Sequence, residues 1–338
     1  MIIAVTKETT SEERRVALTP SAVKKLTELG IKIKIEKDAG QKSGYDDQSY
    51  IQAGAEISQT AADCLAQADF LFKINAPKAE EWNLISENTS VIADFRNGIG
   101  IDEKIIEKKA LSLYALERIP RISRAQNMDI LSSQDNLSGY KAALDAVNRL
   151  NRAAPMMTTA AGSVLPIKVL VIGIGVAGLQ AIATAKRLGA NVSATDVRAE
   201  TKEQALSLGA RFIENSQINE QLTEADIIIT AAGSAPKAPV LVKKEQLDNL
   251  KKDAIMFDLS GNVENPEHSP SFRTAKGAEV IFNPQTAALI PYTASNLFAN
   301  NISNFFRLLS PDYKIKPQPD FNDEIIASTC IYYQGKRR

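Results

Sequence analysis

The chain has 338 residues, more than a single hydrophobic core usually organises, so we expect two domains. Its 40 lysine and arginine residues balance 40 aspartate and glutamate residues, which excludes a strong overall field of one sign. The longest apolar runs, such as Val169 to Ile174, are much shorter than the ~20 residues of a membrane-spanning helix. We therefore expect no transmembrane segment in this chain and no nucleic-acid partner.

The N-terminus, the cysteines and the histidine indicate a cytoplasmic protein without a metal site. Met1 to Val5 reads directly into a strand and lacks the regions of a signal peptide. Cys64 and Cys330 share no metal or redox spacing. The one histidine, His268, lies between two prolines, where an exposed turn is expected. With neither a second histidine nor a cysteine pair, no zinc site is predicted.

The N-terminal stretch of the chain, Met1 to about Ala115, alternates strand-like and helix-like runs, as expected for a mainly parallel sheet. Ile31 to Ile35 is a period-two strand. Before it, Thr19-Pro20-Ser21 opens a helix through Leu29 that Gly30 can terminate. Further strands are expected at Asp69 to Ile74, Thr89 to Ala93 and Leu111 to Ala115.

The alternating pattern breaks between Ile119 and Ser133, where a polar segment is expected. A helix is predicted from about Asn136 to Asn151, and we place the crossover between domains on it. A second β-α series runs from Lys168 to about Asn283. Ser295 to Leu309 has the apolar spacing of a helix with one buried face, which would return the chain to the first domain.

A glycine motif opens the second series: Gly173-Ile174-Gly175-Val176-Ala177-Gly178. The motif follows a predicted strand, Lys168 to Ile172, and begins a predicted helix, Val176 to Leu188, which is the setting of a dinucleotide site. Gly173 permits a tight turn, Gly175 lets the backbone approach a pyrophosphate, and Gly178 allows close packing of helix and strand. The alternative is a glycine turn in a doubly wound fold without nucleotide.

Asp196 follows the next predicted strand, Asn191 to Thr195, and is placed to accept hydrogen bonds from an adenosine ribose. A carboxylate there repels a 2′-phosphate and favours NAD(H) over NADP(H), although Arg198 acts against this preference. Thr230 to Gly233 ends the predicted strand Asp226 to Ile229. Its small side chains would let nicotinamide or ribose lie against the backbone, or would simply form a turn.

These patterns predict an α/β fold of two Rossmann-like, doubly wound parallel-sheet domains with a cleft between them. Residues 1–133 and 296–338 are predicted to form a discontinuous N-terminal domain. Residues 134–295 are predicted to form the NAD(H)-binding domain.

Three long stretches resemble proton-translocating NAD(P) transhydrogenases, in the extramembrane component that binds NAD(H). They are Pro120 to Gln134, Pro155 to Gly162, and Val176 to Ala190 followed by Ala194 to Ala199. The likeness extends more loosely from Lys7-Glu8 to Ser328-Thr329-Cys330. The resemblance implies a Si-specific, proton-translocating NAD(P) transhydrogenase that is active only with partner subunits.

The resemblance also implies which residues bind the cofactor NAD(H). The nicotinamide end would be surrounded by Arg121, Ser123, Arg124, Gln126, Asp129 and Ser132. The pyrophosphate and adenosine end would be held by Gly173, Gly175, Val176, Ala177, Gly178, Asp196, Val197 and Arg198. Ala231 and Ala232 complete the predicted site, and NADP(H) is expected only on a partner subunit.

In this family hydride moves directly from C4 of NADH to C4 of NADP⁺ on the partner subunit, so the protein contributes orientation. The predicted catalytic residues are Gln126, Arg121 and Asp129. Gln126 would bind the nicotinamide carboxamide or ribose, and Arg121 with Asp129 would form a polar pair that holds the loop.

The implied partners are a second copy of this chain, in a homodimer, and the membrane-embedded and NADP(H)-binding transhydrogenase subunits. A separate membrane component would couple hydride exchange to proton translocation. The chain would then lie in the cytoplasm, peripheral to the inner face of the cell membrane.

Two features of the sequence keep other functions open. The family usually has a long mobile segment where Glu214 to Ala225 stands here, so a catalytically silent NAD(H)-binding module is one alternative. The superfamily also includes alanine dehydrogenase, whose carboxylate-binding cations match Arg15 and Lys73. However, Asp94 replaces its catalytic histidine and its catalytic aspartate is replaced near Asn262, so a structural role is favoured for the two cations.

Overall fold

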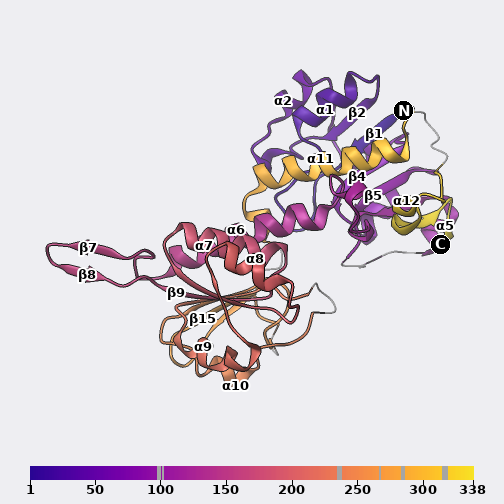
Figure 1. Ribbon diagram of the computed structural model, residues 1–338. Helices are drawn as coiled ribbons and strands as arrows, with labels where there is room; N and C mark the ends of the chain where they lie inside the picture. Colours follow the sequence, from indigo (N-terminus) through magenta and orange to yellow (C-terminus); the bar gives the residue numbers. More distant parts are fainter. Residues whose placement is uncertain (97–99, 101–102, 234–237, 266–267, 283–285, 314–318) are drawn as a thin grey trace. The chain divides into compact units, whose positions relative to one another are not determined.

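The computed structural model describes residues 1–96, 100, 103–233, 238–265, 268–282, 286–313 and 319–338. The chain divides into two compact units, called here unit 1 (Met1–Gln134 and Ile290–Arg338) and unit 2 (Asp135–Leu289). Each unit is built around a largely parallel sheet with helices (Figure 1). The predicted α/β class, with parallel-rich sheets in two domains, is thereby confirmed.

The described residues of unit 1 contain an eight-stranded sheet in the order β17-β16-β6-β5-β4-β1-β2-β3. Its strands are β1 (Ile2–Val5), β2 (Lys32–Glu36), β3 (Glu56–Ser58), β4 (Phe70–Asn75), β5 (Ser90–Asp94), β6 (Ser112–Ala115), β16 (Cys330–Tyr333) and β17 (Lys336–Arg337). Strands β3-β2-β1-β4-β5-β6 pair in parallel, and β16 and β17 extend the sheet antiparallel. The parallel order is that of a doubly wound Rossmann-type sheet.

Helix α11 (Pro291–Leu309) belongs to unit 1 and lies beside α1 (Pro20–Thr27). Its apolar face is buried because Phe306 packs edge-on against Phe70 at 5.1 Å and Phe72 at 5.5 Å between ring centroids. The other helices of unit 1 are α2 (Asp47–Gln52), α3 (Ala61–Leu65), α4 (Ala79–Leu84), α5 (Glu103–Lys108) and α12 (Glu324–Thr329). On α4, the single tryptophan of the chain, Trp82, is completely buried.

The described residues of unit 2 contain a seven-stranded sheet in the order β11-β10-β9-β12-β13-β15-β14. Its strands are β9 (Lys168–Ile172), β10 (Asn191–Thr195), β11 (Arg211–Phe212), β12 (Ile227–Thr230), β13 (Ile255–Asp258), β14 (Ser271–Arg273) and β15 (Glu279–Phe282). All pair in parallel except β14, which pairs antiparallel with β15. Unit 2 therefore repeats the parallel strand order of unit 1.

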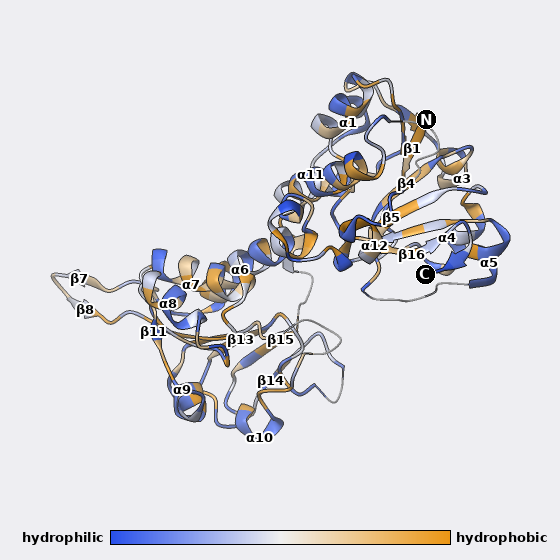
Figure 2. Cartoon of the chain, turned by 45° about the vertical axis from the view of Figure 1, so that its right-hand side comes forward, coloured by the Kyte–Doolittle hydropathy of each residue, from blue (hydrophilic) through white to orange (hydrophobic). Residues whose placement is uncertain are grey.

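The helices of unit 2 connect these strands. Among the described residues these connecting helices are α7 (Val176–Arg187), α8 (Thr201–Ser207), α9 (Ile218–Glu224) and α10 (Lys244–Leu247), and most of a further helix, α6 (Ile130–Arg149), also belongs to unit 2. Figure 2 shows hydrophobic residues along the central strands of each unit and hydrophilic residues on short outer helices such as α5 and α10. Among the described residues, no helix combines the length and hydropathy needed to cross a membrane.

A two-stranded hairpin precedes β9, formed by β7 (Met157–Thr159) and β8 (Gly162–Val164). All residues of both strands are exposed, and the hairpin extends away from the body of unit 2 in Figures 1 and 2. The sequence predicted no strand here, because strands that bury neither face have no hydrophobic alternation.

Helix α6 (Ile130–Arg149) begins earlier than predicted, since the helix was expected from Asn136. The reason is the carboxylate of Asp129, which accepts hydrogen bonds from the backbone N–H and the hydroxyl of Ser132 and so caps the first turn. The end of the predicted polar segment is therefore helical. The first segment of unit 1 ends at Gln134, within this helix.

Candidate functional site

The candidate site in unit 2 lies where the strand order reverses, between β9 and β12. In open α/β sheets, ligands bind beyond the carboxyl ends of the strands at such a switch point. Gly173 follows β9 directly, and Ala231 follows β12. Gly173 has a φ of +97°, a left-handed conformation that glycine adopts without strain.

The three glycines of the motif meet very different surroundings. A Cβ on Gly173 would lie 2.6 Å from the Ala231 carbonyl carbon, and a Cβ on Gly178 would lie 1.9 Å from the Gly173 oxygen. Both positions are therefore restricted to glycine by backbone atoms. A Cβ on Gly175 would meet no protein atom within 4 Å, so this is the one position of the three that faces open space.

Helix α7 begins at Val176, immediately after the open position. The first N–H groups of a helix have no partner within the helix and carry a positive partial charge, which suits a phosphate. The first hydrogen bond joins the Leu179 N–H to the Gly175 oxygen at 2.8 Å. Val176, Ala177 and Gly178 thus form the first turn, as the motif predicts.

Asp196 follows β10 and is nearly buried, with 7% of its side chain exposed. Its Oδ2 accepts a hydrogen bond from the Ile174 N–H at 2.7 Å, which ties the glycine turn to the end of β10. Arg198 binds the same carboxylate through its guanidinium, at 2.9 to 3.0 Å. Burial raises the pKa of Asp196, but these hydrogen bonds outweigh burial and hold it below its ordinary value.

The loop after β12 is held by Asn262, a buried residue whose sequence position suggested only a replaced aspartate. The Asn262 side chain accepts from the Ala232 N–H at 2.9 Å and donates to the Ala232 carbonyl at 2.8 Å and the Pro239 carbonyl at 2.9 Å. The amide therefore fastens the backbone that lies against Gly173. No local pattern could reveal this contact, because it joins distant segments of the chain.

Asp258, at the end of β13, fixes the turn that carries Asn262. Its Oδ1 accepts hydrogen bonds from the Thr230 hydroxyl at 2.9 Å and the Asn262 N–H at 2.9 Å, and its Oδ2 accepts from the Val263 N–H at 3.0 Å. The ends of β12 and β13 are thus joined through one buried carboxylate. The motif, Asp196, Ala231 and Ala232 are brought together around this framework.

The residues predicted for the nicotinamide end lie on unit 1, all of them in the segment before α6 except Ser132, which lies in the first turn of that helix. Arg121, Ser123, Arg124 and Gln126 are all exposed on the surface of this segment. Asn301 and Asn304 of α11 donate to the Asn127 carbonyl at 2.9 and 3.1 Å, which attaches the segment to that helix.

Two contacts in this segment differ from expectation. Among the described residues no ion pair joins Arg121 and Asp129, and the Asp129 carboxylate instead binds Ser132 and caps α6. The predicted Arg121–Asp129 pair is therefore wrong. Arg124 instead makes a two-pronged ion pair with Asp323, at 2.6 and 3.0 Å.

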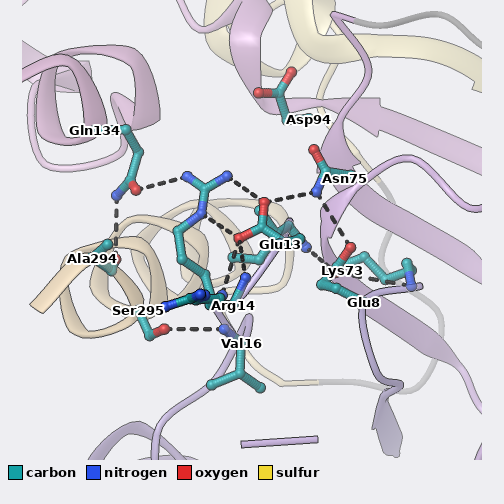
Figure 3. A network of polar contacts seen from close by, with 12 residues as sticks. Glu8, Glu13, Arg14, Val16, Lys73, Asn75, Asp94, Gln134, Ala294 and Ser295 are labelled. Carbon is teal, nitrogen blue, oxygen red and sulfur yellow. Dashed lines mark hydrogen bonds and ion pairs between the residues drawn. The ribbon is translucent and has the colours of Figure 1, made fainter. Parts of the chain in front are cut away.

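Unit 1 has its own switch point, between β1 and β4, and charged side chains fill it (Figure 3). Lys73 on β4 is 1% exposed, and its Nζ lies 2.8 Å from Glu81 and 3.8 Å from Glu8. It also donates to the Lys7 carbonyl at 3.0 Å. Burial lowers the pKa of Lys73, but the surrounding carboxylates outweigh this and raise it above its ordinary value.

Arg15 occupies the other half of the charged cluster. Its guanidinium binds both oxygens of Glu13 at 2.7 Å and donates to the Gln134 side-chain oxygen at 2.8 Å. Asn75 links the two halves by donating to Glu13 and Glu8 (Figure 3). Arg15 and Lys73 are therefore held by carboxylates of the chain itself, and Asp94 pairs with Arg96 at 2.7 Å.

Two doubly wound units, one of them with a glycine fingerprint at its switch point, define the class of Rossmann-type proteins. The family description "Alanine dehydrogenase/PNT, N-terminal domain" matches residues 4–138, and "Alanine dehydrogenase/PNT, C-terminal domain" matches residues 142–338. The chain belongs to the alanine dehydrogenase/PNT family.

Similar proteins narrow the relationship within this family. An NAD(P) transhydrogenase alpha subunit protein of Rhodospirillum rubrum is 38% identical over 380 aligned residues, covering 99% of this chain and 97% of that protein. The crystal structure of transhydrogenase from Sinorhizobium meliloti is 40% identical, with a TM-score of 0.88, and covers 100% of this chain and 98% of that one. The predicted resemblance to transhydrogenase alpha subunits is confirmed.

A structure of L-alanine dehydrogenase matches with a TM-score of 0.84 over 100% of this chain and 96% of that one, at 23% identity. This likeness shows the shared fold alone. The alignment with the Rhodospirillum rubrum protein is longer than the 338 residues of this chain, so that relative has residues without a counterpart here.

Proposed function

We propose that this chain is the NAD(H)-binding component of an NAD(P) transhydrogenase of the Si-specific, proton-translocating type. It binds NADH in unit 2 and presents it for direct hydride transfer to NADP⁺ on a partner subunit. The observation that carries the proposal is the glycine turn at the switch point of unit 2, in a chain that matches transhydrogenase alpha subunits over 99% of its length.

The fit of a dinucleotide rests on three features of unit 2. The open space beside Gly175 and the N-terminus of α7 suit the pyrophosphate. The Asp196 carboxylate suits the hydroxyls of the adenosine ribose. The backbone at Ala231 and Ala232, held in place by Asn262, suits the nicotinamide side because the small side chain of the half-buried Ala232 leaves room for a ligand to approach.

The bound nucleotide supplies the hydride, so the residues of this chain bind and orient. Gln126 is exposed at the end of a 3₁₀ turn, which suits a hydrogen bond to the nicotinamide carboxamide or ribose. Arg121 is proposed as a second polar contact at the same end. Asp129 and Ser132 hold the end of the loop by capping α6.

Gln126→Asn tests this role, because the shorter side chain keeps the amide and moves it away from its target. We expect slower hydride exchange with an unchanged Kd for NADH. Stopped-flow exchange and a fluorescence titration measure the two quantities separately, and an unchanged exchange rate would remove Gln126 from the mechanism.

The homodimer is the second element of the proposal, with the hairpin β7-β8 as its contact surface. Large apolar side chains are exposed on and beside the hairpin: Met156, Met157, Val164 and Leu165. A lone two-stranded hairpin cannot bury such side chains, and exposed apolar groups of this kind mark interaction surfaces. A second copy of the chain would cover them.

Leu165→Glu tests the dimer, because Leu165 is 80% exposed and the replacement leaves the fold of one chain undisturbed. We expect the mass in sedimentation equilibrium to fall from that of two chains to that of one. Leu206→Glu, on α8, is the matched control, since Leu206 is also exposed but lies away from the hairpin. A wild-type chain that sediments as a monomer contradicts the proposed dimer.

The remaining partners are the membrane-embedded and NADP(H)-binding transhydrogenase subunits, which would hold this chain at the inner face of the cell membrane. The short interval from Glu214 to Ala225 bears on this docking. It is filled by a 3₁₀ turn, Asn215–Gln217, and by α9, whose Leu222 is buried. A compact connection replaces the long segment expected in the family.

Reconstituted exchange is the decisive experiment. The chain is mixed with an NADP(H)-binding transhydrogenase component, and hydride exchange between NADH and an NADP⁺ analogue is followed. Exchange is expected only in the mixture. Confirmed NADH binding and complex formation without exchange would favour a silent NAD(H)-binding module, and formation of NADH from NAD⁺ and alanine by the chain alone would favour the dehydrogenase.

A further inference from the structure

The carboxylate of Asp196 is fully occupied within the chain itself. Its Oδ1 accepts hydrogen bonds from the N–H and the Nε of Arg198, at 2.9 and 3.0 Å. Its Oδ2 accepts from the Ile174 N–H at 2.7 Å and from Nη2 of Arg198 at 2.9 Å. Each oxygen therefore has two donors, and a carboxylate offers about four acceptor positions in all.

A ribose cannot bind this carboxylate unless a donor leaves, and only one group is free to do so. The two backbone N–H groups are fixed by the glycine turn and by the turn after β10. The Arg198 side chain is 48% exposed, whereas that of Asp196 is 7% exposed. The guanidinium can therefore move into solvent, and the ribose hydroxyls would take its place.

We propose that Arg198 determines the nucleotide selectivity of this site by competing with the adenosine ribose for Asp196. This inference rests on the proposed NAD(H) binding in unit 2. In the NADH complex, the displaced guanidinium loses its ion pair, which weakens binding. With NADPH, the displaced guanidinium can pair with the 2′-phosphate, which arginine binds through two parallel hydrogen bonds. Arg198 thus narrows the preference for NAD(H) that Asp196 creates.

The side chain of Arg198 is not required for the local fold. The Arg198 N–H and the Ile174 N–H hold Asp196 without it. The Arg198 carbonyl accepts a hydrogen bond from the Thr201 hydroxyl at 2.8 Å, so Arg198 contacts the first residue of α8 without using its own side chain. The guanidinium adds one contact to the turn, a hydrogen bond from Nη2 to the Ile174 carbonyl at 3.2 Å. A variant that lacks the guanidinium should therefore keep its structure.

The test compares the Kd values of NADH and NADPH for the full-length chain, measured by fluorescence of the reduced nicotinamide. For Arg198→Ala we expect NADH to bind up to about fivefold tighter, as for loss of a partly exposed ion pair. We expect NADPH to bind about tenfold weaker, because a charge-assisted phosphate contact is lost. Arg187→Ala, in the last turn of α7, removes the same charge far from the fingerprint and should change neither value.

Arg198→Lys adds a second line of evidence. The ammonium keeps the charge that attracts a 2′-phosphate but cannot bridge both oxygens of Asp196. We expect it to bind NADH more tightly than wild type and to retain most of the NADPH affinity. Salt should weaken NADPH binding more in wild type than in Arg198→Ala.

The inference is overturned if Arg198→Ala weakens NADH binding, or if the ratio of the two Kd values stays that of wild type. Either result would mean that Arg198 supports the adenosine end or is inert. A wild-type chain with no saturable NADH binding would instead contradict the proposed function. Should Arg198→Ala fail to fold, the ratio measured for Arg198→Lys decides the matter, because an unchanged ratio there also overturns the inference.

Discussion

The two units share one parallel strand order but have opposite chemistry at their switch points. In unit 1, the space between β1 and β4 is occupied by the buried charges of Lys73, Glu8 and Glu81. In unit 2, the space between β9 and β12 is lined by backbone at Gly173 and Ala231, and Gly175 faces open space. The same fold thus offers a ligand site twice, and side chains close one of them.

The contrast between the units shows that the fold determines where a ligand site can form, whereas the residues at that place determine whether it stays open. A doubly wound sheet places strand ends and helix N-termini at the switch point in both units. Arg15 and Lys73 would suit an anionic ligand, yet Glu13, Glu8 and Glu81 already neutralise them. Unit 1 therefore uses its switch point for internal ion pairs, whereas unit 2 leaves room for a nucleotide.

The largest loss of folding stability should come from breaking the ion pairs of unit 1. Lys73→Met leaves Glu8 and Glu81 buried beside an apolar group, and loss of one partner from such a cluster costs about 3–5 kcal/mol. Chemical unfolding should show this loss, while the Kd of NADH at unit 2 stays within about twofold of wild type. A weakened NADH affinity would contradict the conclusion that the ion pairs of unit 1 serve stability alone and that unit 2 binds the nucleotide.

The pH dependence of this variant provides a control. Burial raises the pKa of Glu8, and Lys73 acts against that rise, so its removal should raise the pKa further. A carboxyl group with a raised pKa in the folded state binds more protons there than in the unfolded state. The stability deficit of Lys73→Met should therefore shrink as the pH falls and grow as it rises.

The next largest effect is expected from substitutions at two glycines of the fingerprint, one of which should affect stability and the other nucleotide binding. A Cβ in Gly178→Ala would lie 1.9 Å from the Gly173 oxygen, and backbone cannot yield as a side chain can, so we expect a loss of about 3 kcal/mol. Gly175→Ala meets no protein atom within 4 Å and should unfold like wild type, yet it should weaken NADH binding. If Gly175→Ala binds NADH normally, the pyrophosphate does not lie there.

A smaller effect is expected when Asn262 can no longer donate hydrogen bonds. Asn262→Asp keeps the shape but leaves the carbonyls of Ala232 and Pro239 without their donor, which should cost about 2 kcal/mol. The melting temperature and the NADH affinity should both fall. Asn249→Asp, an exposed residue of unit 2, is the matched control, and equal effects of the two changes would deny Asn262 its role in holding the loop.

The smallest effect concerns selectivity within unit 2. Asp196→Ala removes the ribose acceptor and should weaken NADH binding about tenfold. It also frees Arg198 and removes a charge that repels the 2′-phosphate, so NADPH should bind more tightly than to wild type. Parallel titrations with the two nucleotides measure this reversal. Equal weakening of both would assign Asp196 to the glycine turn alone.

The sequence predicts the core of both units well because their strands are short, apolar and bounded by turn residues. The bounds of β9 and β10 match the predicted ranges, and α11 appears where its apolar spacing indicates. The fingerprint is local as well, since Gly173 and Gly178 are restricted by backbone atoms near them in the chain or just beyond the adjacent strand.

The features that the sequence could not predict depend on a choice between alternative hydrogen-bond partners, or on contacts between residues far apart in the chain. Asp129 was expected to pair with Arg121, but its carboxylate binds Ser132, three residues further along the chain. The contacts of Asn262 with Ala232 join residues that follow neighbouring strands. Asp196 was expected to be open to a ribose, whereas Arg198 covers it. In each case several partners were plausible, and only the fold selects one.

The buried indole of Trp82 gives unit 1 an optical signal of its own. It is the single tryptophan of the chain and lies in the apolar core of unit 1. Its emission will report the opening of that core and will be insensitive to unfolding confined to unit 2. The fluorescence of NADH bound to unit 2 reports on that unit. Tryptophan emission and NADH emission can therefore be used in one sample to follow unit 1 and unit 2 separately.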